Sequence, residues 1–255
     1  MHPEIKPLIV GNWKMNGLSD SLSVVQELSN HLENQPENPC AVVICPPATL
    51  IWPMRQIDKT NIAIGGQNCH AEASGAHTGD ISAEMLFDAG ARYVIVGHSE
   101  RRADAGETSA HVREKVVAAN RAKITPIVCV GETEQERLGG EALKVVTGQL
   151  FDSIPDSADG TPIIVAYEPV WAIGTGLVPS LEDIGEMHAA IRGELVKRFG
   201  DGGKNIAILY GGSMKPGNAA EILSVAHVNG GLVGGASLKA DNFIAIIEAS
   251  WKPNA

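Results

Sequence analysis

Residues 93–98 read YVIVGH, a run of β-favouring apolar side chains that ends in a glycine and a histidine. Seven further apolar runs of this kind begin near Leu8, Ala41, Ile62, Pro126, Ile163, Ile206 and Gly231. Their mean spacing is about 32 residues, which is the length of one strand followed by one helix. Because the runs are apolar on both faces, they are typical of parallel strands that are covered by helices.

Amphipathic stretches separate these runs, and they predict helices near residues 18–34, 105–122 and 181–199. Pro216 is expected in the first turn of another helix, with Ser213 as a nearby capping residue. Eight alternating strand–helix units in one chain predict an α/β fold, a single (β/α)8 barrel of the TIM-barrel type over residues 1–255. A doubly wound open sheet is the alternative, since the number of strands does not decide whether a sheet closes.

The composition limits the classes of partner. The 255-residue chain has 20 Lys and Arg against 30 Asp and Glu, a net charge of −10, which argues against a nucleic-acid or anionic-membrane surface built on bulk positive charge. Two stretches without charged residues, 38–54 and 222–238, are too short for a good membrane span. With no apolar leader and no Cys-x-x-Cys pair, we expect a reduced, cytoplasmic protein.

Polar side chains follow the runs at the point where each strand should end. Asn12 and Lys14 follow the first run, His98 and Glu100 the fourth, and Glu168 the sixth. Each alone is more often a solvated charge or a structural pair. Together they predict a site, because ligands of such folds bind at the carboxyl ends of the strands.

Glycine-rich turns follow the seventh and eighth runs, at residues 211–213 and 234–235. Glycine lets backbone N–H groups approach a ligand closely, and this position in a barrel is the usual phosphate cradle. Tight turns alone are the competing explanation. No Walker motif is present and no GxGxxG follows a strand, so the sequence does not indicate a nucleotide.

Cys69, His70, Glu72 and His77 resemble a metal site, but no second ligand cluster supports it, and we expect no metal. The irregular stretch 68–82 that contains them is long, and such loops usually form a functional or contact surface. We therefore expect an interface loop here. Cys129 lies within an apolar run and is expected to be a buried structural thiol.

Seven motifs in order along nearly the whole chain resemble the triosephosphate isomerase family. They are NWKMNG at 12–17, GGQN at 65–68, YVIVGHSERR at 93–102, CVGET at 129–133, AYEPVWAIGTG at 166–176, YGGSMKPGNA at 210–219 and GGLVGGASL at 230–238. The resemblance implies cofactor-independent interconversion of dihydroxyacetone phosphate and glyceraldehyde 3-phosphate through an enediolate, in glycolysis and gluconeogenesis. An isomerase of a four-carbon ketose phosphate, with the same catalytic groups and different pocket walls, is the alternative. A non-catalytic phosphate-binding barrel is ranked lower, because it would have no need for the catalytic groups.

The same resemblance implies roles for individual residues. It makes Glu168 the base, His98 the electrophile and Lys14 the cation, with Asn12 alongside and Glu100 in support. The substrate phosphate would meet backbone N–H groups at the glycine-rich turns and at one further position. These residues are Gly174, Ser213, Gly234 and Gly235.

The resemblance also implies a homodimer, in which Thr78 points toward Asn12 and Lys14 of the neighbouring subunit. The chain departs from the family pattern at His77 and Asp80, where an aromatic residue and Glu are more frequent, and at Leu177, where Lys is frequent. None of the three departures falls on a proposed catalytic group, so only the details of the subunit contact are affected.

Overall fold

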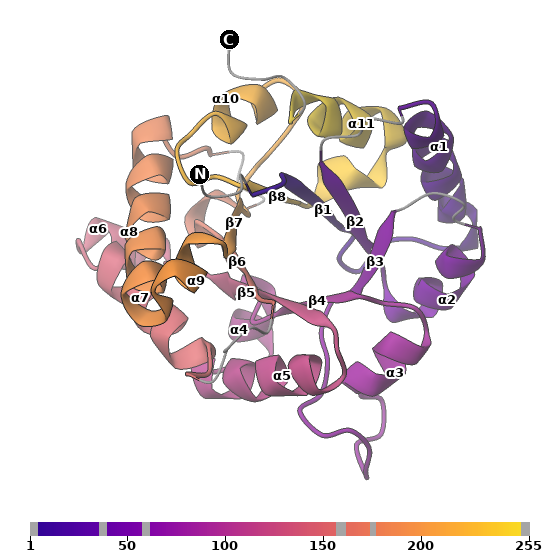
Figure 1. The fold of residues 1–255 in the computed structure, drawn as a ribbon, viewed down its shortest axis with the longest axis horizontal. Coiled ribbons are helices and arrows are strands. Elements are labelled where there is room, and N and C mark those ends of the chain that lie inside the picture. The colour runs from indigo at the N-terminus through magenta and orange to yellow at the C-terminus, as the bar shows by residue number, and fades with distance from the viewer. Residues whose placement is uncertain (1–4, 36–39, 58–61, 157–161, 174–176, 251–255) are drawn as a thin grey trace.

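Eight parallel strands form a closed barrel in the computed structural model, in the order of the sequence (Figure 1). The structure describes residues 5–35, 40–57, 62–156, 162–173 and 177–250. The strands are β1 (Leu8–Asn12), β2 (Ala41–Cys45), β3 (Ala63–Gly66), β4 (Tyr93–Val96), β5 (Thr125–Val130), β6 (Ile164–Tyr167), β7 (Ala207–Tyr210) and β8 (Gly230–Val233). Pairing of β1 with β8, with Val10 opposite Leu232, closes the sheet. All eight predicted strands are therefore confirmed, each beginning within one residue of its predicted start, and the open-sheet alternative is wrong.

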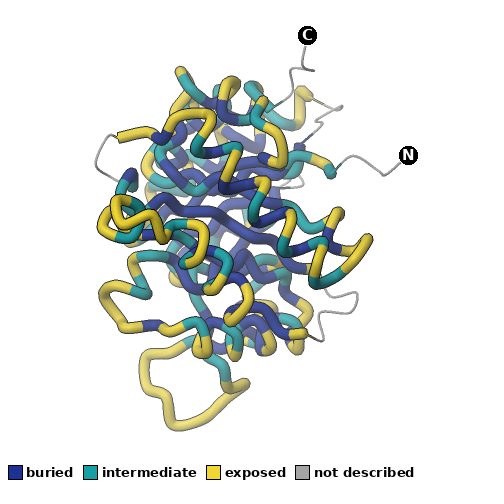
Figure 2. Tube along the Cα trace, turned by 90° about the vertical axis from the view of Figure 1, so that its left-hand side faces the viewer, coloured by how far each residue is buried: buried dark blue, intermediate teal, exposed yellow. Residues whose placement is uncertain are grey.

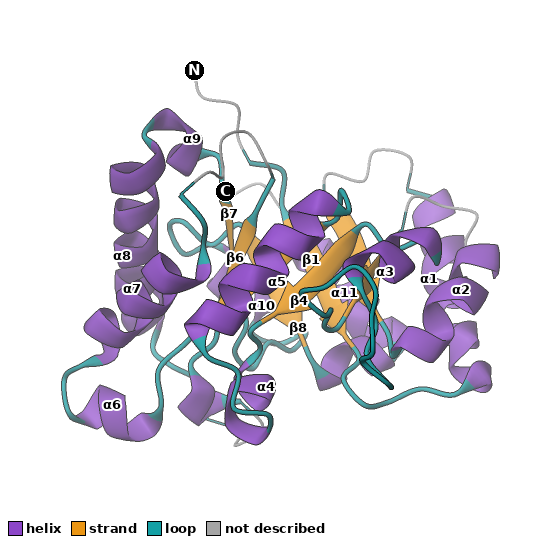
Figure 3. Cartoon of the chain, turned by 90° about the horizontal axis from the view of Figure 1, so that it is seen from below, coloured by secondary structure: helices purple, strands orange, loops and turns teal. Residues whose placement is uncertain are grey.

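Helices surround the barrel and lie between consecutive strands (Figures 1 and 3). They are α1 (Leu22–Glu33), α2 (Ala48–Ile57), α3 (Ala83–Asp88), α4 (Ser99–Asp104), α5 (Ser109–Arg121), α6 (Glu134–Leu138), α7 (Ala142–Ser153), α8 (Leu181–Phe199), α9 (Asp201–Lys204), α10 (Ala219–Leu223) and α11 (Ala240–Ala249), with 3-10 turns η1 (Ser19–Ser21), η2 (Val170–Ala172) and η3 (Gly235–Leu238). Within the described ranges, no helix combines the length and the apolar character needed to cross a bilayer.

The pleat of the strands divides the buried apolar side chains into two sets. Alternate residues, such as Leu8 and Val10 on β1 and Ile164 and Ala166 on β6, belong to one cluster. Their neighbours, such as Ile9, belong to the larger cluster that includes the helices. This alternation follows from the two-residue period of a β-strand. Figure 2 shows the buried strands enclosed by a more exposed outer layer.

The prediction of a helix beginning at Pro216 is wrong. Residues 216–218 form a turn, and α10 begins three residues later, at Ala219. The side-chain oxygen of Asn218 accepts the Lys215 N–H at 2.7 Å, and the Asn218 amide donates to the Ser213 carbonyl oxygen at 3.1 Å. Asn218 thus stabilises a local turn that competes with helix, as asparagine often does. Ser213 instead faces the central cavity.

One exposed loop extends beyond the ring of helices that surrounds the barrel (Figure 1). Residues 72–80 are all exposed, and the loop projects next to α3 (Figures 1 and 2). Its two ends are joined, since the His70 N–H donates to the Ile81 carbonyl oxygen at 2.8 Å. Its role as an interface between subunits stays a prediction.

His188 is a fully buried histidine on α8, and it lies edge-on against Tyr167 with ring centroids 5.9 Å apart. Its Nδ1 atom lies 3.2 Å from the His227 carbonyl oxygen. Burial lowers the pKa of His188 to about 4, because a charged imidazole would lose its hydration there. The folded protein therefore keeps this side chain neutral.

This burial predicts a loss of stability in acid. Between pH 6.5 and 4 the unfolded chain binds a proton at His188 that the folded chain does not, so the free energy of unfolding falls as the pH falls. The pKa of about 4 in the folded state, against about 6.5 unfolded, makes this contribution about 2 kcal/mol between pH 7 and pH 5. Urea unfolding at both pH values measures it.

His188→Gln removes the titrating group, so the difference between the two pH values should shrink by that amount. The matched control is Ala189→Gln on the same helix, at an exposed position where the change removes no titrating group, so the pH dependence should stay as in the parent. An identical pH dependence in parent and His188→Gln would contradict the prediction.

Candidate active site

The inward-facing residues of two strands form series that end in residues of the candidate site. On β1 the inward series Leu8 and Val10 continues to Asn12, and on β6 the series Ile164 and Ala166 continues to Glu168. Because every strand points the same way, these series end at one rim of the barrel. Asn12 and Glu168 are both buried there, although their strands lie far apart in the sequence.

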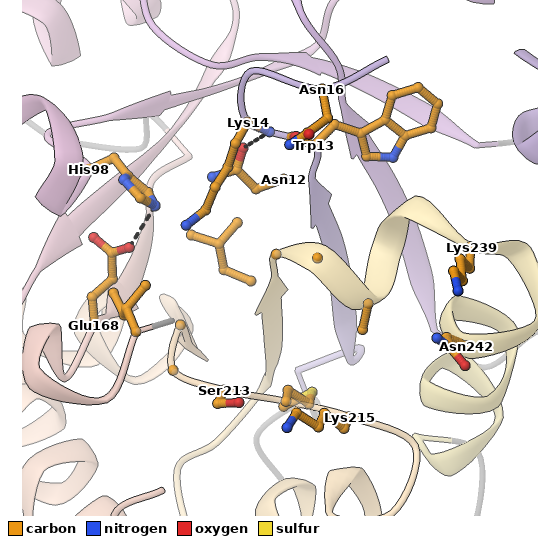
Figure 4. Close-up of a pocket in the computed structure, with 18 of the residues that line it drawn as sticks. Asn12, Trp13, Lys14, Asn16, His98, Glu168, Ser213, Lys215, Lys239 and Asn242 are labelled. Atoms are coloured by element: carbon orange, nitrogen blue, oxygen red, sulfur yellow. Dashed lines mark hydrogen bonds and ion pairs between the residues drawn. The ribbon is translucent and has the colours of Figure 1, made fainter. Parts of the chain in front are cut away.

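A cavity of about 530 Å³ opens at this rim, and Figure 4 shows the residues that line it. Of the residues predicted from the sequence, the structure brings seven together in the wall of this cavity: Asn12, Lys14, His98, Glu168, Ser213, Gly234 and Gly235. Glu100 does not line the cavity, but its carboxylate contacts Lys14 and His98. Gly174 lies outside the described residues.

Two donors hold the Glu168 carboxylate in this structure. The Ser99 N–H donates to Oε2 at 2.9 Å, and Nε2 of His98 lies 2.9 Å from Oε1 (Figure 4). The side chain of Glu168 is only 1% exposed. The carboxylate is therefore positioned beside the imidazole, at the edge of the cavity.

His98 is the capping residue of α4. Its Nδ1 atom accepts the N–H of Glu100 at 3.2 Å, so the proton of the neutral ring is on Nε2, which faces Glu168. Burial by itself lowers the pKa of His98, but the contact with the Glu168 carboxylate outweighs burial and raises that pKa above its ordinary value. The charge of the imidazole therefore depends on where Glu168 lies.

Lys14 has a left-handed backbone, with φ of 54°, which is strained for a residue with a side chain. Two hydrogen bonds stabilise it: its N–H donates to Asn12 Oδ1 at 3.0 Å, and Nε2 of Gln67 donates to its carbonyl oxygen at 2.8 Å. Its ammonium group lies 2.6 Å from Oε1 of Glu100. This conformation directs Lys14 into the cavity, where Figure 4 shows it near His98.

The opposite wall is formed by the glycine-rich turns after β7 and β8. A Cβ atom on Gly235 would meet nothing within 4 Å, and one on Gly234 would meet only Cε of Lys14, at 3.6 Å. The backbone of this pair is thus open to the cavity, and it begins the 3-10 turn η3. Ser213 lies on the same side of the cavity (Figure 4). Such a surface suits an anionic group, because backbone N–H groups at glycines can reach it.

One buried acid was missed by the sequence analysis. Glu132 follows β5 and is fully buried, and its Oε1 atom accepts the Tyr167 hydroxyl at 3.1 Å and the Trp171 indole N–H at 2.9 Å. Arg137 lies 3.2 Å from the same oxygen. Glu132 thereby anchors η2, which follows Glu168 directly. Glu132 falls at a strand end, as the site residues do, but only the structure reveals its partners.

Of the four candidate metal ligands, His70 and His77 lie together in the structure, with ring centroids 4.0 Å apart. Cys69 is buried, which raises the pKa of its thiol to about 12, and its sulfur faces the Lys115 carbonyl oxygen. In the described part of the chain, His70, His77 and Asp80 have potential donor atoms within 4.8 Å of one another. Both the histidine at 77 and the aspartate at 80 are exposed, and exposed groups of this kind are common without a metal.

Thr78 lies on the exposed loop and does not line the cavity of its own chain. Leu177, the other departure from the family pattern, is 52% exposed. Cys129 is fully buried, and burial raises the pKa of its thiol well above the ordinary value. The prediction of a buried, unreactive thiol at this position is confirmed.

Comparison with known proteins gives a consistent result. Residues 7–250 match the family model described as triosephosphate isomerase. The chain is 59% identical to the triosephosphate isomerase of Afipia carboxidovorans over 250 residues, which cover 98% of this chain and 99% of the relative. It is 57% identical to that of Hyphomonas neptunium over 242 residues, which cover 94% and 97%.

A solved structure is also similar. The crystal structure of triosephosphate isomerase from Bartonella henselae superimposes with a TM-score of 0.90 at 48% sequence identity. The match covers 97% of this chain and 100% of that one.

The anchoring of Glu132 predicts a difference between two buried tyrosines. Tyr167→Phe removes a hydrogen bond to a buried carboxylate and should lower the free energy of unfolding by about 1.5–3 kcal/mol. Tyr210→Phe is the matched control, because the Tyr210 hydroxyl is buried without a hydrogen-bond partner in the described structure. That change should cost less than about 0.5 kcal/mol. Urea unfolding of both variants measures the contrast, and equal losses would contradict the interpretation.

Proposed function

The chain belongs to the triosephosphate isomerase family and interconverts dihydroxyacetone phosphate and glyceraldehyde 3-phosphate, and we propose that Glu168, His98 and Lys14 carry out this reaction in the central cavity. The relatives are named for a triose phosphate, which does not favour the alternative of a four-carbon substrate. The observation that carries the assignment of residues is the convergence of a buried carboxylate, an imidazole and an ammonium group on one cavity.

Glu168 acts as the general base. Its carboxylate removes a proton from C1 of dihydroxyacetone phosphate and returns it to C2 of the resulting enediolate. The hydroxyl proton passes from O1 to O2 in the same conversion, so that the carbonyl group moves by one carbon. Burial of Glu168 supports this role, because a site shielded from water protects the enediolate from side reactions. To reach the substrate, the carboxylate exchanges its contacts with Ser99 and His98 for a position over the substrate carbon.

His98 and Lys14 stabilise the oxygen atoms on which charge develops. The Nε2–H of His98 donates to the substrate oxygen, and the tautomer is supported by the N–H of Glu100 on Nδ1. When Glu168 turns toward the substrate, its effect on the pKa of His98 weakens, and burial then favours the neutral ring. Lys14 supplies positive charge to the enediolate oxygen, with Asn12 alongside and Glu100 holding the ammonium group.

The phosphate group of the substrate is bound by backbone N–H groups at Ser213, Gly234 and Gly235, with Gly174 as a further donor. The open space above the two glycines supports this position. The reaction needs no cofactor, because each step is a proton transfer between the substrate and the groups of this chain.

The role of Glu168 predicts a specific loss of turnover. Glu168→Gln keeps the shape and an acceptor for the Ser99 N–H but removes the basicity, so kcat should fall by about 10²–10⁴-fold or more. A coupled assay with NADH and glycerol-3-phosphate dehydrogenase measures it. Binding of the unreactive analogue glycerol 3-phosphate should change little, and Glu134→Gln on the exposed face of α6 serves as the control. Near-normal turnover in Glu168→Gln would exclude Glu168 as the base.

We also propose that residues 1–255 act as one domain and assemble into a homodimer in the cytoplasm. The exposed loop at residues 72–80 supports the dimer, because Thr78 on it is exposed and does not line the cavity of its own chain, so it can approach Asn12 and Lys14 of a second subunit. Cys45, Cys69 and Cys129 are buried free thiols, which suits a reducing compartment.

Shortening the loop tests the dimer. Replacement of residues 72–79 by two glycines retains the His70–Ile81 hydrogen bond that joins the loop ends. The product should be a folded monomer with low activity, because the loop would no longer contact the neighbouring Asn12 and Lys14. Light scattering and circular dichroism measure mass and folding. A fully active parent monomer at micromolar concentration would contradict the proposal.

A further inference from the structure

A second cavity, of about 240 Å³, lies beside the first, and Glu168 lines both. It is enclosed by the start of α4, the end of β5 and the side chain of Gln149 on α7. Ala103 and Thr133 line it and are exposed, so it reaches the protein surface.

The Glu168 carboxylate faces the second cavity in this structure. Its Oε2 atom accepts the N–H of Ser99, which belongs to the lining of the second cavity but not to that of the first. The side chain is only 1% exposed, so bulk water does not reach the carboxylate across the molecular surface. In the described part of the chain Glu168 lines two cavities, and solvent can approach its carboxylate through either of them.

The lining of the second cavity suits water. Arg102 contributes a guanidinium group whose hydrogen bonds, among the described residues, go to neutral oxygens: the carbonyls of Gly97 and Cys129 and the hydroxyls of Ser109 and Ser153. A cation without a carboxylate partner favours hydration. At about 30 Å³ per molecule, the volume is sufficient for several waters, each with polar partners in the wall.

During turnover the first cavity holds the substrate, while the proton taken from C1 resides on Glu168 as a carboxylic acid. The acid reaches the second cavity when it returns to the contact with the Ser99 N–H that it has in this structure. That proton either returns to the substrate at C2 or exchanges with water. We propose that the second cavity is the water passage through which the proton held by Glu168 exchanges with solvent. The proposal rests on the proposed role of Glu168 as the base. In D2O the step breaks the O–H bond of the acid, forms an O–D bond and releases HOD, so no electrons are transferred.

Isotope partitioning in D2O tests the passage. Dihydroxyacetone phosphate is converted in D2O, the aldehyde product is trapped at once by an NAD-dependent dehydrogenase, and NMR gives the ratio of H to D at C2. Retained H reports direct transfer, and D reports exchange. The series Ala103→Val, Ala103→Leu and Ala103→Phe progressively obstructs the mouth of the second cavity. We expect the H-to-D ratio to rise along the series, at least two-fold for the largest side chain, at unchanged kcat.

Ala105→Phe is the matched control, since Ala105 is exposed beyond the end of the same helix and does not line the cavity. The ratio of H to D in the product formed by Ala105→Phe should equal the ratio for the parent. The smaller members of the series keep the test valid if Ala103→Phe fails to fold. An unchanged ratio in active Ala103→Leu and Ala103→Phe would overturn the passage while leaving the base intact. Absence of isomerase activity in the unmodified protein would instead overturn the proposed function.

Discussion

The two-residue period of eight parallel strands is the constraint on which the site depends. It turns alternate side chains into the barrel, and because all strands run in one direction, the inward series end at the same rim. Asn12 on β1 and Glu168 after β6 therefore belong to one cavity. A shift of one residue in either strand would direct these side chains to the helices instead. Closure of the sheet through β1 and β8 then encloses the site on all sides.

Close packing of the backbone keeps Glu168 in position. A Cβ atom on Gly131 would lie 1.8 Å from the Glu168 carbonyl oxygen, and one on Gly211 would lie 2.9 Å from its Cγ atom. Glycine is required at both neighbours because the chain segments approach too closely for a side chain. On the other side, η2 is anchored to the buried Glu132. Glu168 is thus held by steric contact with the adjacent strand ends and by the hydrogen bond that its carboxylate accepts from the Ser99 N–H.

The electrostatics of the cavity oppose those of the whole chain. The chain has a net charge of −10, yet the residues that line the cavity include three lysines, Lys14, Lys215 and Lys239, and one carboxylate, that of Glu168. A local excess of positive charge in a concave site attracts an anion even when the surrounding protein is acidic. Composition describes the charge of the whole chain, and it does not report the charge of the site itself.

The sequence by itself determined the eight strands, each begun within one residue, and the polar side chains at their ends, because apolar runs and glycine-rich turns are local patterns. Its motifs also determined the family. Only the tertiary structure decided the rest. Glu132 and Trp171, which share a hydrogen bond, are 39 residues apart in the sequence, and Glu168 and Ser99 are 69 residues apart. Neither contact can therefore be predicted from a local sequence pattern. The start of α10 was mistaken for a similar reason: a hydrogen bond from the Lys215 N–H to the Asn218 side chain outweighs the helical preference of a proline at the first turn.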